Sequence, residues 1–200
     1  MNMKENTKER ITTINTKRMF ADALTGLLKQ KPLSKITVTE LINFCGVNHK
    51  TFYYHFSNIY DLIKWMLEYD IIRHIKEFNL LKDYKDVIHI VSDYMEKNKS
   101  ILHQILKDIG REQLRILFYD DFASTFEPAI TEEIEKKKYS ISKNCILFLI
   151  SSFSELLANT IIDCINGTVT IQKDDLVKYM EVFIKPLFQA ALKEANKKSL

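Results

Sequence analysis

The sequence predicts an all-α protein. Its 200 residues include only four glycines and three prolines, too few for the frequent turns of a β-sandwich or barrel. Hydrophobic residues make up 46% of the chain and recur at the three- and four-residue spacing of amphipathic helices. A chain of this length is long enough to bury a hydrophobic core in one or two domains.

The first helix is predicted over residues 8–29. Its apolar stripe consists of Ile11, Ile14, Met19, Ala23, Leu24, Leu27 and Leu28. Pro32 lies in the connection that follows, and proline cannot continue a helix. We expect the stripe to cover the two shorter helices that come next.

The second helix is predicted to begin near Thr37. Thr37 and Glu40 have the spacing of a capping box, in which each side chain satisfies a backbone N–H at the helix start. The helix should end at Gly46, because glycine best tolerates the left-handed conformation of a helix C-terminus. Its buried side is expected to consist of Val38, Leu41, Ile42 and Cys45.

The third helix follows a turn of three residues and has Asn48 as its N-cap. Phe52 and Phe56 lie four residues apart and should face the core. Two short helices joined by a glycine-containing turn form a helix-turn-helix, whose second helix fits the major groove of DNA, about 12 Å wide. The face expected to point outward carries His49, Lys50, Tyr53 and Tyr54.

These outward residues have the chemistry for contacts with DNA. Lys50 and His49 can donate to guanine N7 and O6, and Thr51 can meet a thymine methyl or a base acceptor. Tyr53 and His55 can donate to phosphate oxygens. An aromatic stripe is equally typical of a core, but the caps, the glycine turn and the outward Lys50 together favour DNA binding.

The charge distribution agrees with this interpretation. The net charge is +3, but residues 1–58 hold nine Lys or Arg against four Asp or Glu, and the rest of the chain holds 20 against 22. A basic excess beside the helix pair suits a domain that faces phosphates. The first segment could follow the DNA backbone as a basic arm with Lys4, Lys8, Arg10, Lys17 and Arg18. The alternative for residues 1–7 is a disordered tail.

Residues 46–67, GVNHKTFYYHFSNIYDLIKWML, resemble the signature of the TetR family of transcription regulators. The resemblance covers about residues 10–67, and KPLSKITV with HFSNIYDLIKW is similar to regulators of dihydroxyacetone kinase operons. Ile59 stands where the family commonly has a phosphate-binding lysine, so Asn58 and the N–H groups of the fourth helix are expected to hold that phosphate. With the cap Asn48, the resemblance implies DNA contacts at Thr37, Thr39, His49, Lys50, Thr51, Tyr53, Tyr54 and His55.

A long helix over residues 58–78 is expected to link a helix-turn-helix domain (1–57) to an effector-binding and dimerisation domain (58–200). Further helices are predicted over residues 85–96, 100–107, 111–136, 142–166 and 174–193. Pro128 and Pro186 should each break or kink a helix, because each removes an interior hydrogen bond at a cost of about 3 kcal/mol.

The last two helices carry more apolar surface than one chain needs to cover. We expect the surplus to form a four-helix interface with two-fold symmetry in a homodimer. The alternative is that other helices of the same chain cover these residues. The expected interface consists of Phe153, Leu157, Ile161, Met180, Phe183, Leu187 and Phe188.

The TetR resemblance also implies a pocket for a small hydrophobic effector, between the fourth helix and the middle helices. Large aromatic residues with few charges among them suit such a ligand. The alternative is that these side chains fill a closed core. The expected lining consists of Trp65, Tyr69, Leu114, Phe118, Phe122 and Phe148.

Other classes of function find little support. The sequence lacks the motifs of metalloproteases, di-iron bundles, phosphate-binding loops and serine hydrolases, so we expect no enzyme activity, cofactor or metal. Its three cysteines are widely spaced in apolar helical sequence, which indicates reduced thiols in the cytoplasm. Polar residues such as Glu155 and Asp163 interrupt the most apolar stretch, 145–165, which indicates a buried helix rather than a membrane span.

The sequence therefore indicates a homodimeric transcription regulator that binds a palindromic operator in double-stranded DNA. We expect a repressor that a small apolar effector releases from the operator. Two alternatives stay open: an effector-free TetR-like co-activator that acts through a partner protein, and a small-molecule carrier built on a helical bundle.

Overall fold

The computed structural model describes the backbone of residues 3–79 and 82–198, and within these ranges the side chains from residue 12 onward. Every regular element in the described ranges is helical, which confirms the predicted all-α class. The elements are α1 (Met3–Leu28), the 3-10 helix η1 (Leu33–Lys35), α2 (Val38–Cys45), α3 (His49–His55), α4 (Ile59–Leu67), the π turn η2 (Glu68–Ile72), α5 (Arg73–Ile75), α6 (Tyr84–Lys97), α7 (Lys99–Ile109), α8 (Arg111–Lys137), α9 (Lys143–Asn166), α10 (Lys173–Tyr179), the π turn η3 (Met180–Ile184) and α11 (Lys185–Lys197).

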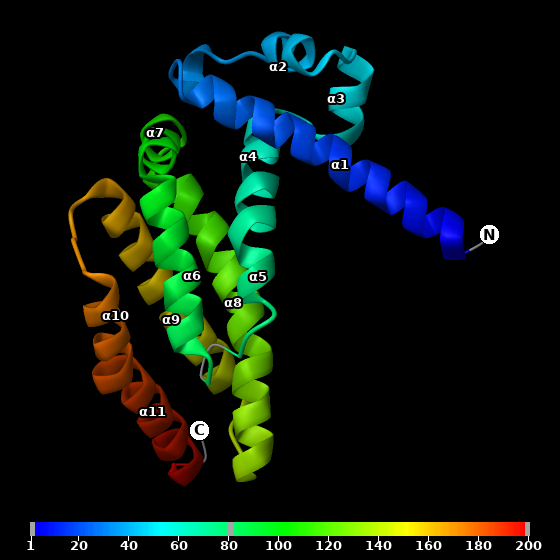
Figure 1. The fold of residues 1–200 in the computed structure, drawn as a ribbon. Helices are drawn as coiled ribbons and strands as arrows, with labels where there is room; N and C mark the ends of the chain where they lie inside the picture. The colour runs from blue at the N-terminus through cyan, green and yellow to red at the C-terminus, as the bar shows by residue number, and fades with distance from the viewer. Residues whose placement is uncertain (1–2, 80–81, 199–200) are drawn as a thin grey trace.

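The first three helices form a small module at one end of the molecule. Figure 1 shows α1 lying across the upper end of α4, with α2 and α3 at the top of the view. Phe20 of α1 is fully buried, and its ring centroid lies 5.2 Å from that of Phe52 and 6.2 Å from that of Phe56. Leu24 and Leu41, both fully buried, belong to the same core. The stripe on α1 therefore covers the α2–α3 pair, as the sequence predicted.

A helical rod joins this module to the bundle below. It consists of α4, η2 and α5, which follow one another from Ile59 to Ile75. Leu62, Ile63 and Leu67 of α4 are buried, as is Ile75 at the far end of the rod. The sequence predicted this long helix, but it did not indicate the π turn in its middle.

The helices α8 and α9 pack as an antiparallel pair. On the polar edge, Arg115 forms an ion pair with Glu155, and Arg111 Nη1 lies 2.7 Å from Asp163 Oδ1. Among the described residues, α9 alone has the length and apolar composition of a membrane-spanning helix. Two of the polar residues that interrupt α9 are thus paired with arginines of α8, as expected for a helix in a bundle.

The two helical prolines behave differently. Pro128 was predicted to break or kink its helix. It does not break it, because α8 is one helix from Arg111 to Lys137. Pro128 is exposed, while its neighbours Phe126 and Ile130 are buried and hold the helix on both sides. Pro186 lies in the first turn of α11, directly after the π turn η3, where the helical hydrogen-bond pattern changes.

One carboxylate is buried inside the bundle. Asp121 of α8 is 5% exposed, and its Oδ1 lies 3.5 Å from Lys76 Nζ. Its Oδ2 has no hydrogen-bond partner among the described residues. Burial raises the pKa of Asp121 to about 6; the Lys76 ammonium opposes this rise and the Glu68 carboxylate adds to it.

We predict that Asp121 destabilises the protein as the pH rises from about 4 to about 7. The unfolded carboxyl loses its proton near its ordinary pKa of 3.8, while the folded one holds its proton until about pH 6. The contribution of this group is therefore fully present below the unfolded pKa and is lost as the pH rises through the folded one. Asp121→Asn removes this loss of stability. The unfolding free energy of the variant minus that of the parent should therefore be about 2 kcal/mol larger at pH 7 than at pH 4.

Urea unfolding at both pH values measures this difference. The exposed neighbour Asp120 provides the control, and Asp120→Asn should keep the pH dependence of the parent. Parallel curves for the parent and Asp121→Asn would contradict the prediction.

Candidate nucleic-acid interface

The start of α2 has the predicted capping box. Thr37 Oγ1 accepts a hydrogen bond from the Glu40 N–H at 3.3 Å, and Glu40 Oε2 accepts one from the Thr37 N–H at 3.1 Å. Lys31 forms an ion pair with Glu40, and this contact holds the pKa of that carboxyl below its usual range. Gly46 ends the helix with φ at +65°, the left-handed conformation that favours glycine. Both ends of α2 are therefore as the sequence predicted.

The orientation of α3 is set by its cap and its buried aromatic side. Asn48 Oδ1 accepts from the Thr51 N–H at 2.9 Å. Phe52 is fully buried and Phe56 is 4% exposed, and both contact Phe20 of α1. Because these two rings hold one side of α3 against the core, the opposite side must face solvent.

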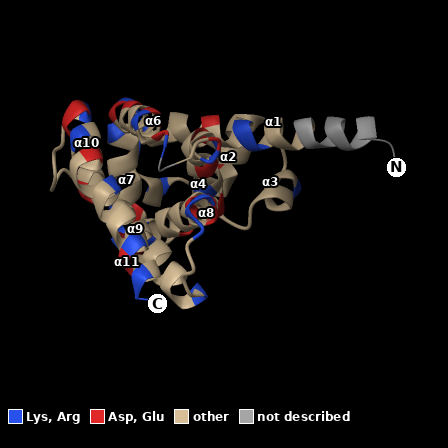
Figure 2. Ribbon diagram, turned by 90° about the horizontal axis from the view of Figure 1, so that it is seen from below, with Lys and Arg blue, Asp and Glu red and all other residues tan. Residues whose placement is uncertain are grey.

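The outer face of α3 is aromatic and cationic. Tyr53 is 56% and Tyr54 77% exposed, and His49 and Lys50 are also exposed. The rings of His49 and Tyr53 stack with their centroids 6.3 Å apart. The helix contains no Asp or Glu, and Figure 2 shows no red segment on it. The structure thus brings four predicted DNA-binding residues together on one surface without acidic residues.

Two further predicted contact residues are less available than the sequence suggested. The Thr51 hydroxyl donates to Asn48 Oδ1 at 3.1 Å. Only its methyl group and the lone pairs of its oxygen are then available for contacts with DNA. His55 is half-buried, and burial lowers the pKa of its imidazole, with the Lys17 ammonium adding to the effect. His55 is therefore neutral at pH 7 and can donate to a phosphate only as a neutral imidazole.

Around α3, the N-terminal end of α4 and the start of α2 supply other predicted residues. Asn58 Oδ1 accepts from the Asp61 N–H at 3.0 Å, and Asp61 Oδ2 accepts from the Ser57 N–H at 3.0 Å. These bonds already occupy two donors of the turn, and the Asp61 carboxylate adds a negative charge there. Thr37 and Thr39 are exposed at the start of α2. Phosphate binding at Asn58 is therefore less favourable than at a helix start with free N–H groups and no carboxylate.

The basic arm expected along α1 lies only partly within the described side chains. Lys4, Lys8 and Arg10 are outside them. Lys17 Nζ lies 5.2 Å from the ring centroid of Phe56 and 5.6 Å from that of Trp65. The role of Lys17 as a contact between α1, α3 and α4 was missed, because it depends on how distant helices cross.

The chain resembles two kinds of known protein. Among curated proteins it matches the HTH-type dhaKLM operon transcriptional activator DhaS of Lactococcus lactis, with 22% identity over 127 residues, or 64% of this chain and 67% of the relative. Among solved structures it matches the dihydroxyacetone kinase operon activator DhaS, with a TM-score of 0.64, 17% identity and coverage of 92% of this chain and 99% of the other. It also matches a TetR transcriptional regulator from Streptococcus agalactiae, with a TM-score of 0.51, 25% identity and coverage of 87% and 96%. The chain has the fold of a TetR-type regulator. No family model matches it.

In this TetR-type fold, the six residues expected to line an effector pocket do not meet in one cavity. Phe148 is 69% exposed, and Leu114 and Phe118 are buried. Trp65 and Tyr69 stack with their centroids 4.7 Å apart and are approached by cations. These cations are Lys17, Arg18 and Arg73, of which the two arginines lie 5.7 and 4.6 Å from the Tyr69 ring centroid.

Phe122 lines a cavity toward α10 and α11, and together with Phe118 it also lines a smaller cavity that reaches Leu67 and Ile71 of the helical rod. Two of the six residues therefore lie where the pocket was predicted, and an effector site there stays a prediction. The helical spacing of its aromatic residues gave no information about which of them face α1 and which face solvent.

The residues expected at a dimer interface also divide into two groups. Phe153 and Phe188 are buried within the chain, where their rings meet edge to face at 5.1 Å, so they cannot reach a partner subunit. Leu157, Ile161 and Met180 are half-buried and line the internal cavity. Phe183 and Leu187 are 61% and 58% exposed. Other exposed apolar residues on the same helices are Leu147, Phe148, Leu156, Tyr179 and Val182.

We predict that two aromatic residues close together on α3 affect different properties, one the stability of the fold and the other DNA binding. Phe52→Ala should lower the unfolding free energy by about 3–5 kcal/mol, because it removes a fully buried ring. Tyr54→Ala should change it by less than about 0.5 kcal/mol, because Tyr54 is 77% exposed, but it should weaken DNA binding. Urea unfolding and DNA titration separate the two effects, and equal losses of stability would refute the assignment of the two faces.

Proposed function

We propose that this protein is a transcription regulator that binds a palindromic operator as a homodimer. Residues 1–57 would bind DNA and residues 58–200 would dimerise and respond to an effector. The relatives that the chain matches are named as transcription regulators, not enzymes. As a regulator of transcription, it is expected to act in the cytoplasm. The proposed DNA contacts are Thr37, Thr39, Asn48, His49, Lys50, Thr51, Tyr53, Tyr54, His55 and Asn58.

The observation that carries the proposal is the division of α3 into two faces. Phe52 and Phe56 hold its inner side in the core, while Lys50, Tyr53 and Tyr54 are exposed on the other. Tyr53 and Tyr54 expose large aromatic surfaces to solvent next to the Lys50 ammonium, an arrangement that the core of the module does not require. A major-groove surface gives these side chains a role, since lysine reads guanine and tyrosine donates to phosphates.

The homodimer is supported by exposed apolar surface on α9 and on α10–η3–α11. We define the dimer patch as the exposed residues of these helices: Leu147, Phe148, Leu156, Tyr179, Val182, Phe183 and Leu187. Several large apolar side chains exposed on neighbouring helices are typical of a surface that binds another protein. A two-fold dimer through these helices would also match the symmetry of a palindromic operator.

The sign of regulation has two candidates. A repressor would be released from DNA by a small apolar effector, with a coupling free energy of typically about 1–3 kcal/mol. An activator is favoured by the names of both DhaS relatives, and it could act without an effector through a partner protein. Transcription from the target promoter with and without the protein distinguishes the two.

We predict that Lys50→Ala weakens operator binding by about 1–3 kcal/mol if Lys50 reads a guanine. If Lys50 contacts a phosphate instead, the loss of affinity should be the same for all DNA sequences. The slope of log affinity against log salt concentration should then become shallower by about 1. Titrations against operator variants at several salt concentrations measure both quantities. Lys136→Ala, at the far end of α8, is the matched control. Unchanged affinity of Lys50→Ala would refute the assignment of α3.

We predict that Phe183→Glu converts the dimer to a monomer, because it places a charge in an apolar interface. Sedimentation equilibrium at micromolar concentration measures the change. Val169→Glu is the control, because Val169 is also an exposed apolar residue but lies outside the dimer patch. A parent protein that sediments as a monomer would rule out the dimer.

A further inference from the structure

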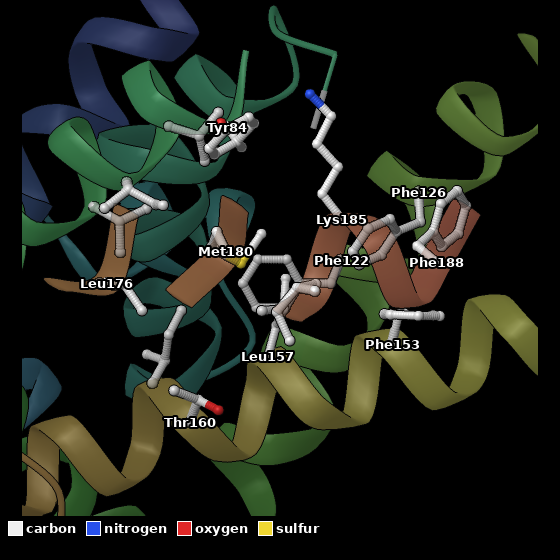
Figure 3. A pocket seen from close by; sticks show the side chains of 15 residues that line it. Tyr84, Phe122, Phe126, Phe153, Leu157, Thr160, Leu176, Met180, Lys185 and Phe188 are labelled. Carbon is white, nitrogen blue, oxygen red and sulfur yellow. The ribbon is translucent and has the colours of Figure 1, made fainter. Parts of the chain in front are cut away.

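An apolar cavity of about 90 Å³ lies between α6, α8, α9 and the α10–η3–α11 segment. Figure 3 shows Phe122, Phe126, Phe153 and Phe188 gathered on one side of it, with Leu176 and Met180 on the other. Protein interiors are close-packed, and voids larger than a water molecule are few. A dry apolar cavity of this kind is suited to small apolar molecules.

A second cavity indicates the shape of the ligand. It measures about 20 Å³ and shares Val91, Phe122 and Ile161 with the first as walls. From there it reaches Leu67 and Ile71 of the helical rod. Two cavities that share one set of walls suit a narrow aliphatic chain better than a bulky ring system.

One residue of the lining of the larger cavity is a cation, and Figure 3 shows its side chain extending away from the phenylalanines. Lys185 is half-buried, and its Nζ lies 5.2 Å from the ring centroid of Tyr84 at the start of α6. No carboxylate of the described residues lies within 4.0 Å of it. The nearby Glu181 is 3.9 Å from Lys85, whose Nζ lies 5.9 Å from the same Tyr84 ring. A partly buried cation beside an apolar cavity favours an anionic group next to it.

The rest of the lining offers no competing polar group. Thr160 Oγ1 donates to the Leu156 carbonyl at 2.7 Å, so its proton is already used within α9. The remaining lining residues are hydrophobic apart from Tyr84 and Lys185. A ligand therefore needs one anionic end and no further polar atoms.

The segment that covers the cavity is less buried at its α10 end, where Lys173 forms an ion pair with Asp93 of α6. None of the residues of α10 and η3 is buried, whereas Phe188, Leu192 and Ala195 anchor α11. The π turn η3 and Pro186 lie between the less buried and the anchored parts, and π turns are frequent at functional sites. Displacing the α10 end while α11 stays in place would break only this exposed ion pair and partly buried apolar contacts, so this end is the least costly route of entry for a ligand.

We propose that this cavity binds an aliphatic monocarboxylate, with its chain among the four phenylalanines and its carboxylate on Lys185. The inference rests on the proposed function in that it names the effector class, but the binding itself does not require DNA. Octanoate is a suitable probe. 1-Octanol and octylammonium have the same chain with a neutral and a cationic end.

Isothermal titration of the full-length protein without DNA tests the proposal. Octanoate should bind saturably, and octylammonium should bind at least tenfold more weakly. Lys185→Met should weaken octanoate by roughly ten- to a hundredfold while leaving octanol within about twofold. Lys185→Arg should restore most of the octanoate affinity, and Lys193→Met, on the exposed face of α11, should match the parent.

A second variant tests the cavity itself. Leu157→Phe should fill part of the space and weaken both octanoate and octanol, with circular dichroism to establish that the variant is folded. The proposal is overturned if octanoate does not saturate, if octanoate and octylammonium bind equally, or if folded Lys185→Met or Leu157→Phe binds octanoate like the parent. Because no arm contains DNA, failure here is separate from failure of Lys50→Ala to weaken operator binding.

Discussion

The contact of Phe20 of α1 with Phe52 of α3 and with Phe56, the C-cap of that helix, is the interaction on which the rest of the structure depends. Phe52 and Phe56 pack edge to face against Phe20, and Phe20 and Phe52 are fully buried. Full burial of an aromatic side chain contributes about 1.5–3 kcal/mol, so a rotation of α3 that exposed both rings would be strongly unfavourable. The outward direction of Lys50 is thus a consequence of packing on the opposite side of the helix.

The same aromatic cluster connects the module of α1, α2 and α3 to the bundle. Phe56 lies 6.2 Å from Trp65 of α4, and Trp65 stacks on Tyr69 at the start of the π turn. Lys17 of α1 lies over both Phe56 and Trp65. A cation over a ring is held less directionally than a hydrogen-bonded ion pair, so these contacts tolerate small rotations of α4 against α1. A small tilt of α4 would therefore cost little at this contact with α1.

The sequence predicted the helix-turn-helix well because the signals are local. The capping pair Thr37 and Glu40, the caps Asn48 and Asn58, and the left-handed Gly46 each act within a few residues, and all are present in the structure. The π turns were not predicted, because they alter the hydrogen bonding of helices without changing the apolar spacing that identifies them.

The helices that follow α4 were predicted less well, because their arrangement depends on contacts between distant parts of the chain. On α9, Phe148 and Phe153 are both large and apolar, yet Phe148 is exposed and Phe153 packs on Phe188. A helix that is apolar nearly all round does not reveal from its sequence which side meets its own chain. Two residues expected in the pocket have other contacts for the same reason: Trp65 and Tyr69 interact with cations of α1, which hydrophobic spacing cannot show.

The α10–η3–α11 segment has two apolar sides, and this has a consequence for how the protein would respond to its own abundance. Its inner row, from Leu176 to Phe188, closes the cavity, and its outer row, with Phe183 and Leu187, belongs to the dimer patch. If both rows are used as proposed, a ligand that shifts the segment alters subunit association, and association alters ligand affinity by the same factor. The ligand concentration needed for a response would then depend on the amount of this protein in the cell. The expression level of its gene would therefore set the ligand concentration at which the protein responds.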